Sequence, residues 1–262
     1  MRSVWLFFAL AVGGIWLLQL PALLGSRGIL PGGVAPYMLP AALGGFTPIL
    51  AAIVAARSEG PGRVRELFAS LRPRAGLAVW YLAALSSFPV IHVLGEAAYR
   101  LATGVPAGDW LYLPRLPQQR VVLLLIPLVE EPGWRGFAMP RLAQRFGWLR
   151  ASWLVGLGWA AWHAVMFLLQ GFDAAAYGLG MTMIVAGSVV FGWLFDRTRG
   201  SLLAAVIAHA GVHLDNPTHA LPAQLTAYAV FTAAVCVAAG AIVVLEGVRQ
   251  RRVGASSAIG HR

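Results

Sequence analysis

The sequence contains no lysine and few acidic residues, with 10 aspartates and glutamates against 20 basic residues that are all arginines. Charged residues make up 11% of the chain and hydrophobic residues 59%. An ordinary soluble domain carries about 25% charged residues, so this composition argues strongly against a water-soluble protein. We therefore expect a membrane protein.

Cysteine is nearly absent as well. The single cysteine, Cys236, lies inside the last long apolar stretch. One cysteine cannot form an internal disulfide, and it cannot build a cysteine-based metal cluster. Both kinds of stabilisation are excluded for this chain.

The formal net charge is +10, and arginine alone supplies the excess. A basic balance of this kind suits either nucleic acid or an anionic lipid surface. The arginines lie in short segments between apolar stretches and do not form one basic stripe with interleaved aromatic residues. We therefore expect lipid headgroups and membrane topology to explain them, and no nucleic-acid partner.

Repeated apolar stretches predict an all-α polytopic membrane protein with a polar intramembrane cavity, because only helices satisfy their own backbone hydrogen bonds in lipid. The eight predicted spans are 4–25, 34–56, 76–99, 119–139, 150–170, 176–195, 200–214 and 223–246. The first follows one arginine and lacks a clear cleavage site, so we expect a retained span and not a signal peptide.

The positions of the arginines predict the orientation through the positive-inside rule. With both termini in the cytoplasm, the cytoplasmic segments contain Arg2, Arg57, Arg63, Arg65, Arg72, Arg74, Arg141, Arg145, Arg150, Arg197, Arg199, Arg249, Arg251 and Arg252. The opposite segments contain Arg27, Arg100, Arg115 and Arg120. We therefore expect a multi-pass protein of the plasma (inner) membrane.

Three regions are expected along the chain. Residues 1–118 hold three spans and a basic cytoplasmic loop, residues 119–216 hold the catalytic core spans, and residues 217–262 hold the last span and a basic tail. In the loop 57–75, apolar residues at helical spacing favour a short amphipathic helix on the inner leaflet, with a solvated basic loop as the alternative. Ser188 and Gly192 form a small-xxx-small pair suited to close helix packing.

Two adjacent carboxylates and an arginine lie near the middle of the predicted span 119–139. An ionised side chain at that depth costs roughly 2.5–3.5 kcal/mol on insertion scales. Glu131 and Arg135 are four residues apart and can pair, whereas Glu130 points about 100° away around the helix. A purely structural ion pair is the plainer alternative.

The two glutamates should titrate separately because their neighbours differ. Glu131 would remain ionised beside its arginine, and Glu130 would be suited to act as a general base. Pro132 removes a backbone hydrogen bond and Gly133 loosens the turn, so we expect the helix to be kinked at this depth.

Histidines lie on two further spans. His163 is about 13 residues into its span and Trp159 lies one turn before it, while His209 and His213 share one face of the span 200–214. The four-residue spacing of His209 and His213 suits a metal pair or two hydrogen-bond donors aimed at one point. The span 200–214 is also short for a bilayer, which is tolerated where a helix lines water. Each histidine alone could be a core residue, but together they predict a wet polar pocket.

These segments resemble the motifs of the CPBP intramembrane protease family, also called the Abi or CAAX prenyl protease type. The family motifs are EExxxR, an aromatic-xxxH and HxxxN or HxxxD, and here they read EEPGWR at 130–135, WAAWH at 159–163 and HAGVH at 209–213. The resemblance covers roughly 119–216, in the family's order and on separate spans. It departs from the pattern at Trp159, where phenylalanine is frequent, and at His213, where asparagine or aspartate is usual.

The resemblance implies a glutamate-type intramembrane endopeptidase. Glu130, assisted by His163, would activate a water molecule, and His209 with His213 would stabilise the tetrahedral oxyanion. Glu131 and Arg135 would fix the geometry of the first motif. Asp215 or Asn216 could replace His213, which is the least secure of these residues.

The expected substrate is a membrane-anchored protein or peptide within the lipid bilayer. The first expectation for a cofactor is none, and the alternative is zinc or another divalent metal held by Glu130, His163 and His209. No HExxH zinc motif is present.

Two other functions are compatible with the same pocket. A proton-coupled membrane transporter could use the acid and histidines as a relay, although the sequence shows none of the internal repeats of many transporters. A non-catalytic immunity or scaffold relative could retain the pocket without turnover. His92 and Glu96, four residues apart in the third span, are a weaker candidate pair.

Overall fold

The computed structural model describes residues 1–105, 117–214 and 225–259. Within these ranges the chain forms helices and turns and no strand, so the predicted all-α membrane architecture is confirmed. Six stretches are long and apolar enough to cross a membrane: Arg2–Ser26, Ala35–Arg57, Ala78–Thr103, Trp148–Leu169, Ala174–Arg197 and Leu225–Arg249.

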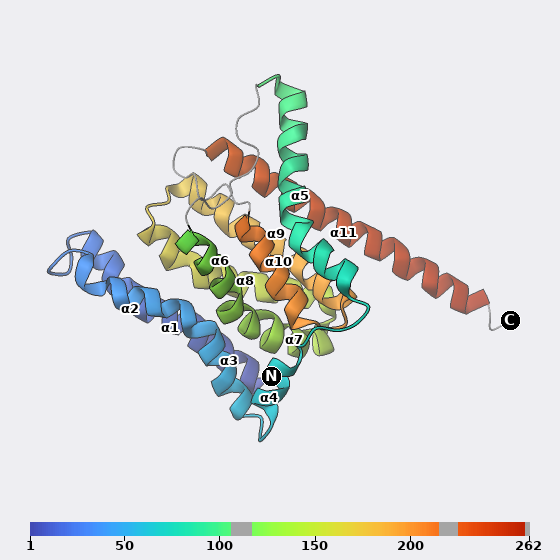
Figure 1. The fold of residues 1–262 in the computed structure, drawn as a ribbon, viewed down its shortest axis with the longest axis horizontal. Coiled ribbons are helices and arrows are strands. Elements are labelled where there is room, and N and C mark those ends of the chain that lie inside the picture. Colours follow the sequence, from blue (N-terminus) through green and yellow to red (C-terminus); the bar gives the residue numbers. More distant parts are fainter. Residues whose placement is uncertain (106–116, 215–224, 260–262) are drawn as a thin grey trace.

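The helices follow one another in a simple order (Figure 1). They are α1 (Arg2–Ser26), η1 (Ala35–Tyr37), α2 (Met38–Leu43), η2 (Gly44–Phe46), α3 (Thr47–Arg57), α4 (Arg63–Ala69), α5 (Ala78–Thr103), α6 (Pro117–Glu131), η3 (Pro132–Ala138), α7 (Met139–Phe146), α8 (Trp148–Leu169), α9 (Ala174–Arg197), α10 (Leu202–Leu214) and α11 (Leu225–Ile259).

The second predicted span is not one uniform helix. Residues 35–57 form two α-helical pieces joined and preceded by short 3-10 turns. Pro36, Pro40 and Pro48 explain the segmentation, because proline removes a backbone donor and clashes with the preceding turn. The last span also differs from the prediction, since α11 continues to Ile259.

The fourth predicted span changes its winding at the two glutamates. Helix α6 ends at Glu131, a π-helical turn runs over Pro132–Ala138, and α7 continues to Phe146. The helix was expected to kink at Pro132 and Gly133, and the structure resolves this irregularity as a π turn. Such turns place consecutive side chains in directions that a regular helix does not allow, and they are frequent at functional sites.

Small residues bring α8 and α9 close together in the middle of the bundle. A Cβ atom on Gly192 would lie 1.8 Å from Ser152 Oγ, and one on Gly156 would lie 2.9 Å from Ser188 Cβ. The close packing predicted for Ser188 and Gly192 is therefore confirmed. Such contacts let two backbones approach within van der Waals distance.

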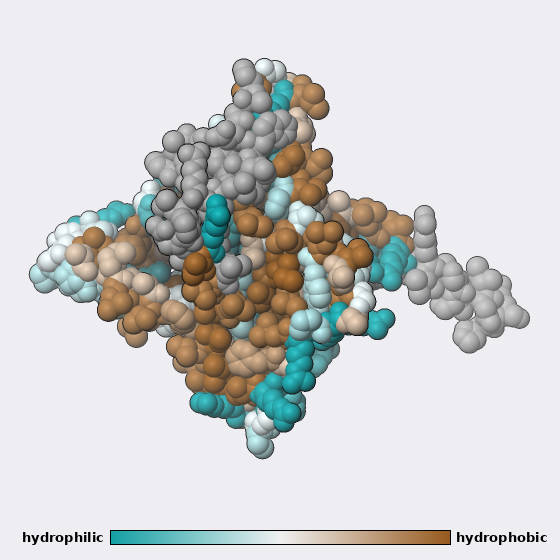
Figure 2. Space-filling view, in the orientation of Figure 1, coloured by the Kyte–Doolittle hydropathy of each residue, from teal (hydrophilic) through white to brown (hydrophobic). Residues whose placement is uncertain are grey.

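One end of the bundle collects the segments that were predicted to face the cytoplasm. Glu59, after α3, accepts a hydrogen bond from Ser3 Oγ at 2.7 Å and pairs with Arg141 of α7. Arg74 donates to the carbonyl of Arg199 at 2.9 Å, after the end of α9. In the view of Figure 2, hydrophilic residues gather at the lower end, where Figure 1 places α4 and the N-terminus, and hydrophobic residues cover the middle.

The loop 57–75 contains a short helix, as the amphipathic pattern predicted. Helix α4 buries Leu67, which is 5% exposed, and its side chain lies close to Gly136 of η3. The apolar face of α4 thus packs partly on the protein itself. Leu202, the first residue of α10, donates its backbone N–H to the carbonyl of Ser70 just after α4.

Candidate active site

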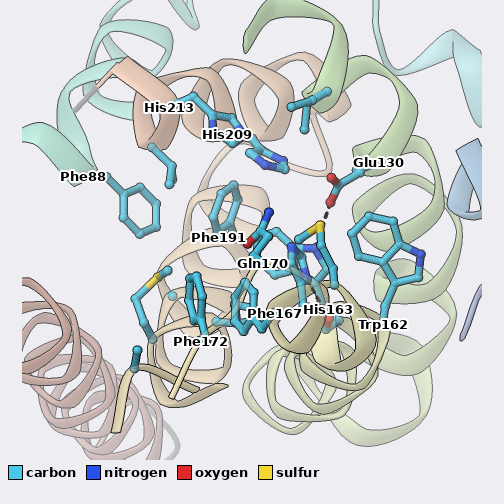
Figure 3. A pocket seen from close by; sticks show the side chains of 18 of the residues that line it. Phe88, Glu130, Trp162, His163, Phe167, Gln170, Phe172, Phe191, His209 and His213 are labelled. Carbon is cyan, nitrogen blue, oxygen red and sulfur yellow. Dashed lines mark hydrogen bonds between the residues drawn. The ribbon is translucent and has the colours of Figure 1, made fainter. Parts of the chain in front are cut away.

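Helices α5, α6, α8, α9, α10 and α11 all contribute to the wall of a cavity of about 560 Å³ inside the bundle. Glu130 of α6, His163 of α8, and His209 and His213 of α10 all line it. Figure 3 shows the side chains of Glu130, His163 and His209 directed toward the same space. The polar pocket predicted from three separate sequence segments therefore exists in the fold.

Glu130 occupies the cavity wall without the arginine, as helical geometry predicted. Its side chain is 5% exposed, and its Oε2 accepts a hydrogen bond of 2.8 Å from Trp159 Nε1. The sequence singled out Trp159 only as the aromatic residue of a motif. A phenylalanine at this position would pack similarly but could not donate this hydrogen bond.

Glu131 and Arg135 lie behind the cavity wall and do not line it. Both are almost completely buried, at 0% and 1% exposure, and Arg135 Nη1 lies 2.9 Å from Glu131 Oε1. The guanidinium carbon lies 4.4 Å from the Trp159 ring centre and 4.2 Å from that of Phe191. Its Nη2 reaches Ser188 Oγ at 3.4 Å. The predicted pair is confirmed, and two aromatic rings contact its guanidinium.

His209 is tied to Glu131, a contact that the sequence did not predict. Its Nδ1 lies 2.8 Å from Glu131 Oε1 across 78 residues of chain. Beside an ionised Glu131, Nδ1 carries the ring proton and donates the hydrogen bond. Nε2 is then the ring nitrogen that is available to the cavity. The second glutamate therefore orients an imidazole as well as an arginine.

His163 is held in a similar way by the backbone. Its Nδ1 lies 2.9 Å from the carbonyl oxygen of Trp159, one turn earlier on α8. A carbonyl only accepts hydrogen bonds, so Nδ1 must donate and Nε2 is again the free ring nitrogen. Trp162 packs edge-on against the same ring, with centroids 4.7 Å apart.

His213 stacks on His209 at the rim of the polar group. Their ring centroids lie 4.9 Å apart with the planes inclined by 20°, and His213 also lines the cavity. The two alternatives to His213, Asp215 and Asn216, lie outside the described residues.

The rest of the cavity wall is mostly apolar. Phe88 of α5, Phe167 of α8, and Met183 and Gly187 of α9 also line the cavity, and Gln170 lines it beyond the end of α8. Figure 3 shows the side chains of Phe88, Phe167 and Gln170 around the same space. The chamber is therefore amphiphilic, because an acid and imidazoles share its wall with aromatic and aliphatic side chains.

The weaker candidate pair on α5 lies elsewhere. His92 is fully buried and Glu96 is 7% exposed, but neither lines the cavity. Glu96 pairs with Arg100 at 3.4 Å, one turn further along the helix. The structure therefore places this pair apart from Glu130.

A zinc site needs several side-chain donors that converge on one point. His163 and His209 each engage Nδ1 and leave Nε2 for the cavity, as metal-binding histidines commonly do. However, the described residues contain no group of three or more histidine, cysteine or acidic side chains placed to hold one ion. Zinc or another divalent metal held by Glu130, His163 and His209 stays the alternative to a site without a cofactor.

The fold and the site define a class of protein: a multi-pass membrane protein in which Glu130 and three histidines line an internal cavity. Residues 109–214 match the Rce1-like family, described as type II CAAX prenyl endopeptidase Rce1-like. The resemblance to CPBP-type proteases that the three motifs indicated is thereby confirmed for this part of the chain.

A curated relative leads to the same family. The chain is 30% identical over 102 residues to the "CAAX prenyl protease 2" of Methanococcus maripaludis, a match that covers 36% of this chain and 38% of the relative. The chain thus spans little more than a third of the relative's length.

Proposed function

We propose that this protein is an intramembrane endopeptidase that hydrolyses a peptide bond with a water molecule activated by Glu130. One observation carries the proposal: a buried carboxylate without an arginine partner faces the same cavity as two histidines from other helices. The match to a protease family over the segment that holds these residues supports this choice of chemistry.

The reaction follows from the roles that these atoms can take. Glu130 accepts a proton from water while the oxygen attacks the peptide carbonyl carbon, which gives a tetrahedral intermediate. His163 lies beside the same space and presents Nε2, so it can hold the water in line. The C–N bond then breaks, and the proton passes from Glu130 to the leaving amine.

His209 is suited to stabilise the negative charge on the intermediate. Its Nε2 faces the cavity, and a doubly protonated ring would donate from that atom while Nδ1 remains bonded to the Glu131 carboxylate. Glu131 and Arg135 then act as positioning residues behind the wall. His213 keeps the ring of His209 in place by stacking.

The proposed substrate is a membrane-anchored protein or peptide. A peptide in the cavity would place its backbone against the acid and histidines and its side chains against Phe88, Phe167 and Met183. Apolar side chains gain free energy on such a surface, by roughly 25 cal/mol per Å² of buried area. We further propose that the protein resides in the plasma membrane with both termini in the cytoplasm.

The test is hydrolysis of a library of membrane-peptide substrates by the purified full-length chain in liposomes. Glu130→Gln should abolish cleavage, because the amide cannot accept the proton of water. Glu96→Gln is the matched control, since it changes another buried glutamate outside the cavity. The same reaction is run with and without a chelator, followed by addition of zinc.

Each result has a defined meaning. Cleavage by the wild type that persists in Glu130→Gln would refute the mechanism. Loss of cleavage with chelator and recovery with zinc would instead assign the water to a metal. A wild type that cleaves nothing, but carries a proton flux that Glu130→Gln removes, would favour the transporter alternative.

A further inference from the structure

Trp162 of α8 forms the part of the cavity wall next to His163. Its side chain is 2% exposed, and its ring centroid lies 4.7 Å from that of His163 with the planes inclined by 77°. The same indole also meets Trp134 of η3, with centroids 6.4 Å apart. Figure 3 shows Trp162 beside His163 at the edge of the cavity. The imidazole of His163 therefore rests against Trp162, and a change in the orientation of the indole would change the space that the imidazole can occupy.

A hydrogen bond fixes the orientation of this indole. Trp162 Nε1 donates to Thr47 Oγ1 at 2.9 Å across 115 residues of chain. Thr47 is the first residue of α3 and is 8% exposed. Without this acceptor, the buried indole N–H would be left unsatisfied, which costs free energy that a bond to water would otherwise recover.

Thr47 is itself held by α1 and by the turn before α3. Its Oγ1 lies 3.0 Å from the carbonyl oxygen of Ala11 in α1 and 2.8 Å from that of Gly44. A hydroxyl group has one proton to donate and lone pairs with which to accept. Thr47 therefore accepts from Trp162 and donates to one of the two carbonyls, a combination that valine cannot reproduce. Its methyl group packs on α1 as well, since a Cβ on Gly14 would lie 3.0 Å from it.

We propose that Thr47 is a positioning residue for the hydrolysis: its hydroxyl group holds Trp162, and Trp162 holds the imidazole of His163 toward the water molecule. The inference rests on the proposed function, because that function gives His163 its role. Thr47 lies outside residues 109–214, the segment that matches the protease family. The first helices of the chain then contribute to turnover and not only to burial.

A matched pair of substitutions separates the two contacts of the Thr47 side chain. Thr47→Val keeps the branched shape but removes the hydroxyl group, whereas Thr47→Ser keeps the hydroxyl group and removes the methyl group. The assay uses the purified full-length protein in liposomes and a membrane peptide that the wild type cleaves. We expect Thr47→Val to lower kcat roughly three- to tenfold with KM little changed, and Thr47→Ser to keep kcat close to the wild-type value. A residue that serves only as packing would give the opposite order, because Thr47→Ser leaves a gap against α1.

Trp162→Phe removes the same hydrogen bond from its other end and keeps an aromatic ring beside His163. Its kcat should fall at least as far as that of Thr47→Val. The double variant should then be no slower than Trp162→Phe alone, because both changes remove one and the same bond. Trp193→Phe is the control, since it removes a tryptophan hydrogen bond to Glu246 outside the cavity lining, and it should leave kcat unchanged.

The hydrogen bond can also be followed without an assay of activity. In protein labelled with ¹⁵N at the tryptophan indoles, the NMR signal that Trp162→Phe removes belongs to the Trp162 N–H. Thr47→Val should move this signal upfield in the proton dimension, because the N–H loses its acceptor. Thr47→Ser should leave the signal in place.

Four results would overturn the inference. Three come from turnover: a Thr47→Val protein as fast as the wild type, a Thr47→Ser protein as slow as Thr47→Val, or a double variant slowed by the product of the two single effects. The fourth is an indole signal that Thr47→Val leaves in place. A wild type that cleaves no membrane peptide refutes the proposed function and this role with it, whereas any of the four results in an active protein refutes the role of Thr47 alone.

Discussion

The buried pair of Glu131 and Arg135 allows a quantitative test of how the polar group is stabilised. Arg135→Met removes two hydrogen bonds and a guanidinium that contacts two aromatic rings. Glu131 then keeps His209 but loses its arginine at 0% exposure. Removing one partner of a buried ion pair costs about 3–5 kcal/mol, because the other charge is left uncompensated.

The double variant separates the charge from the packing. Glu131→Gln alone leaves Arg135 unpaired and should cost a similar 3–5 kcal/mol, so additive effects would total roughly 6–10 kcal/mol. With both changes, no unpaired charge remains from this pair. The cost should then fall to roughly 2–4 kcal/mol, mostly from lost cation–π contact and packing.

The assay is unfolding in mixed micelles of rising SDS fraction, followed by the fluorescence of the 10 tryptophans. The quantity compared is the free energy of unfolding of the wild type, both single variants and the double variant. Single variants that each lose less than about 1 kcal/mol, or a double variant that loses the full sum, would refute the assignment of a buried, mutually compensating pair.

Three further predictions concern other parts of the chain. Trp159→Phe keeps a ring beside Arg135 but removes the N–H that bonds the cavity carboxylate, so the turnover number should fall roughly ten- to a hundredfold, about 1.5–3 kcal/mol, with KM little changed. Gly133→Ala should lower the free energy of unfolding by about 1–3 kcal/mol, because its Cβ would lie 2.7 Å from a backbone oxygen of α3, while Gly178→Ala, in open space, should not. The pKa of Glu59 is lowered from its ordinary value of 4.5, chiefly by its hydrogen bond from Arg141. Its stabilisation should thus be present at neutral pH and be lost as the pH falls below about 4.5, and Glu59→Gln should flatten that acidic loss in a thermal-unfolding series.

The sequence predicted the structure well wherever a feature depends on one helix alone. Long apolar runs predicted α1, α5, α8 and α9 closely, because length and hydropathy suffice to define a span. The i, i+4 spacing of Glu131 and Arg135 predicted their pair, and the pair forms although the winding changes to a π turn at Pro132.

Contacts between helices were harder to predict from the sequence. The bond from His209 to Glu131 depends on how α10 sits against α6, which no local pattern encodes. The π turn at Pro132 was expected only as a kink, because proline predicts a disturbed helix but not its new winding. The broken second span reflects proline spacing within a run that hydropathy alone scores as continuous.

Close glycine contacts between helices hold the shape of the cavity, and these contacts do not involve the charged side chain that lines it. A Cβ on Gly211 would lie 2.3 Å from the carbonyl oxygen of Leu85, so α10 rests directly on the backbone of α5. Gly133 makes the same kind of contact with Pro48 of α3. These backbone contacts fix α10 and η3 whichever side chain occupies position 130. Glu130→Gln should therefore leave the cavity intact, and a loss of hydrolysis in that variant would report on chemistry and not on a collapsed site.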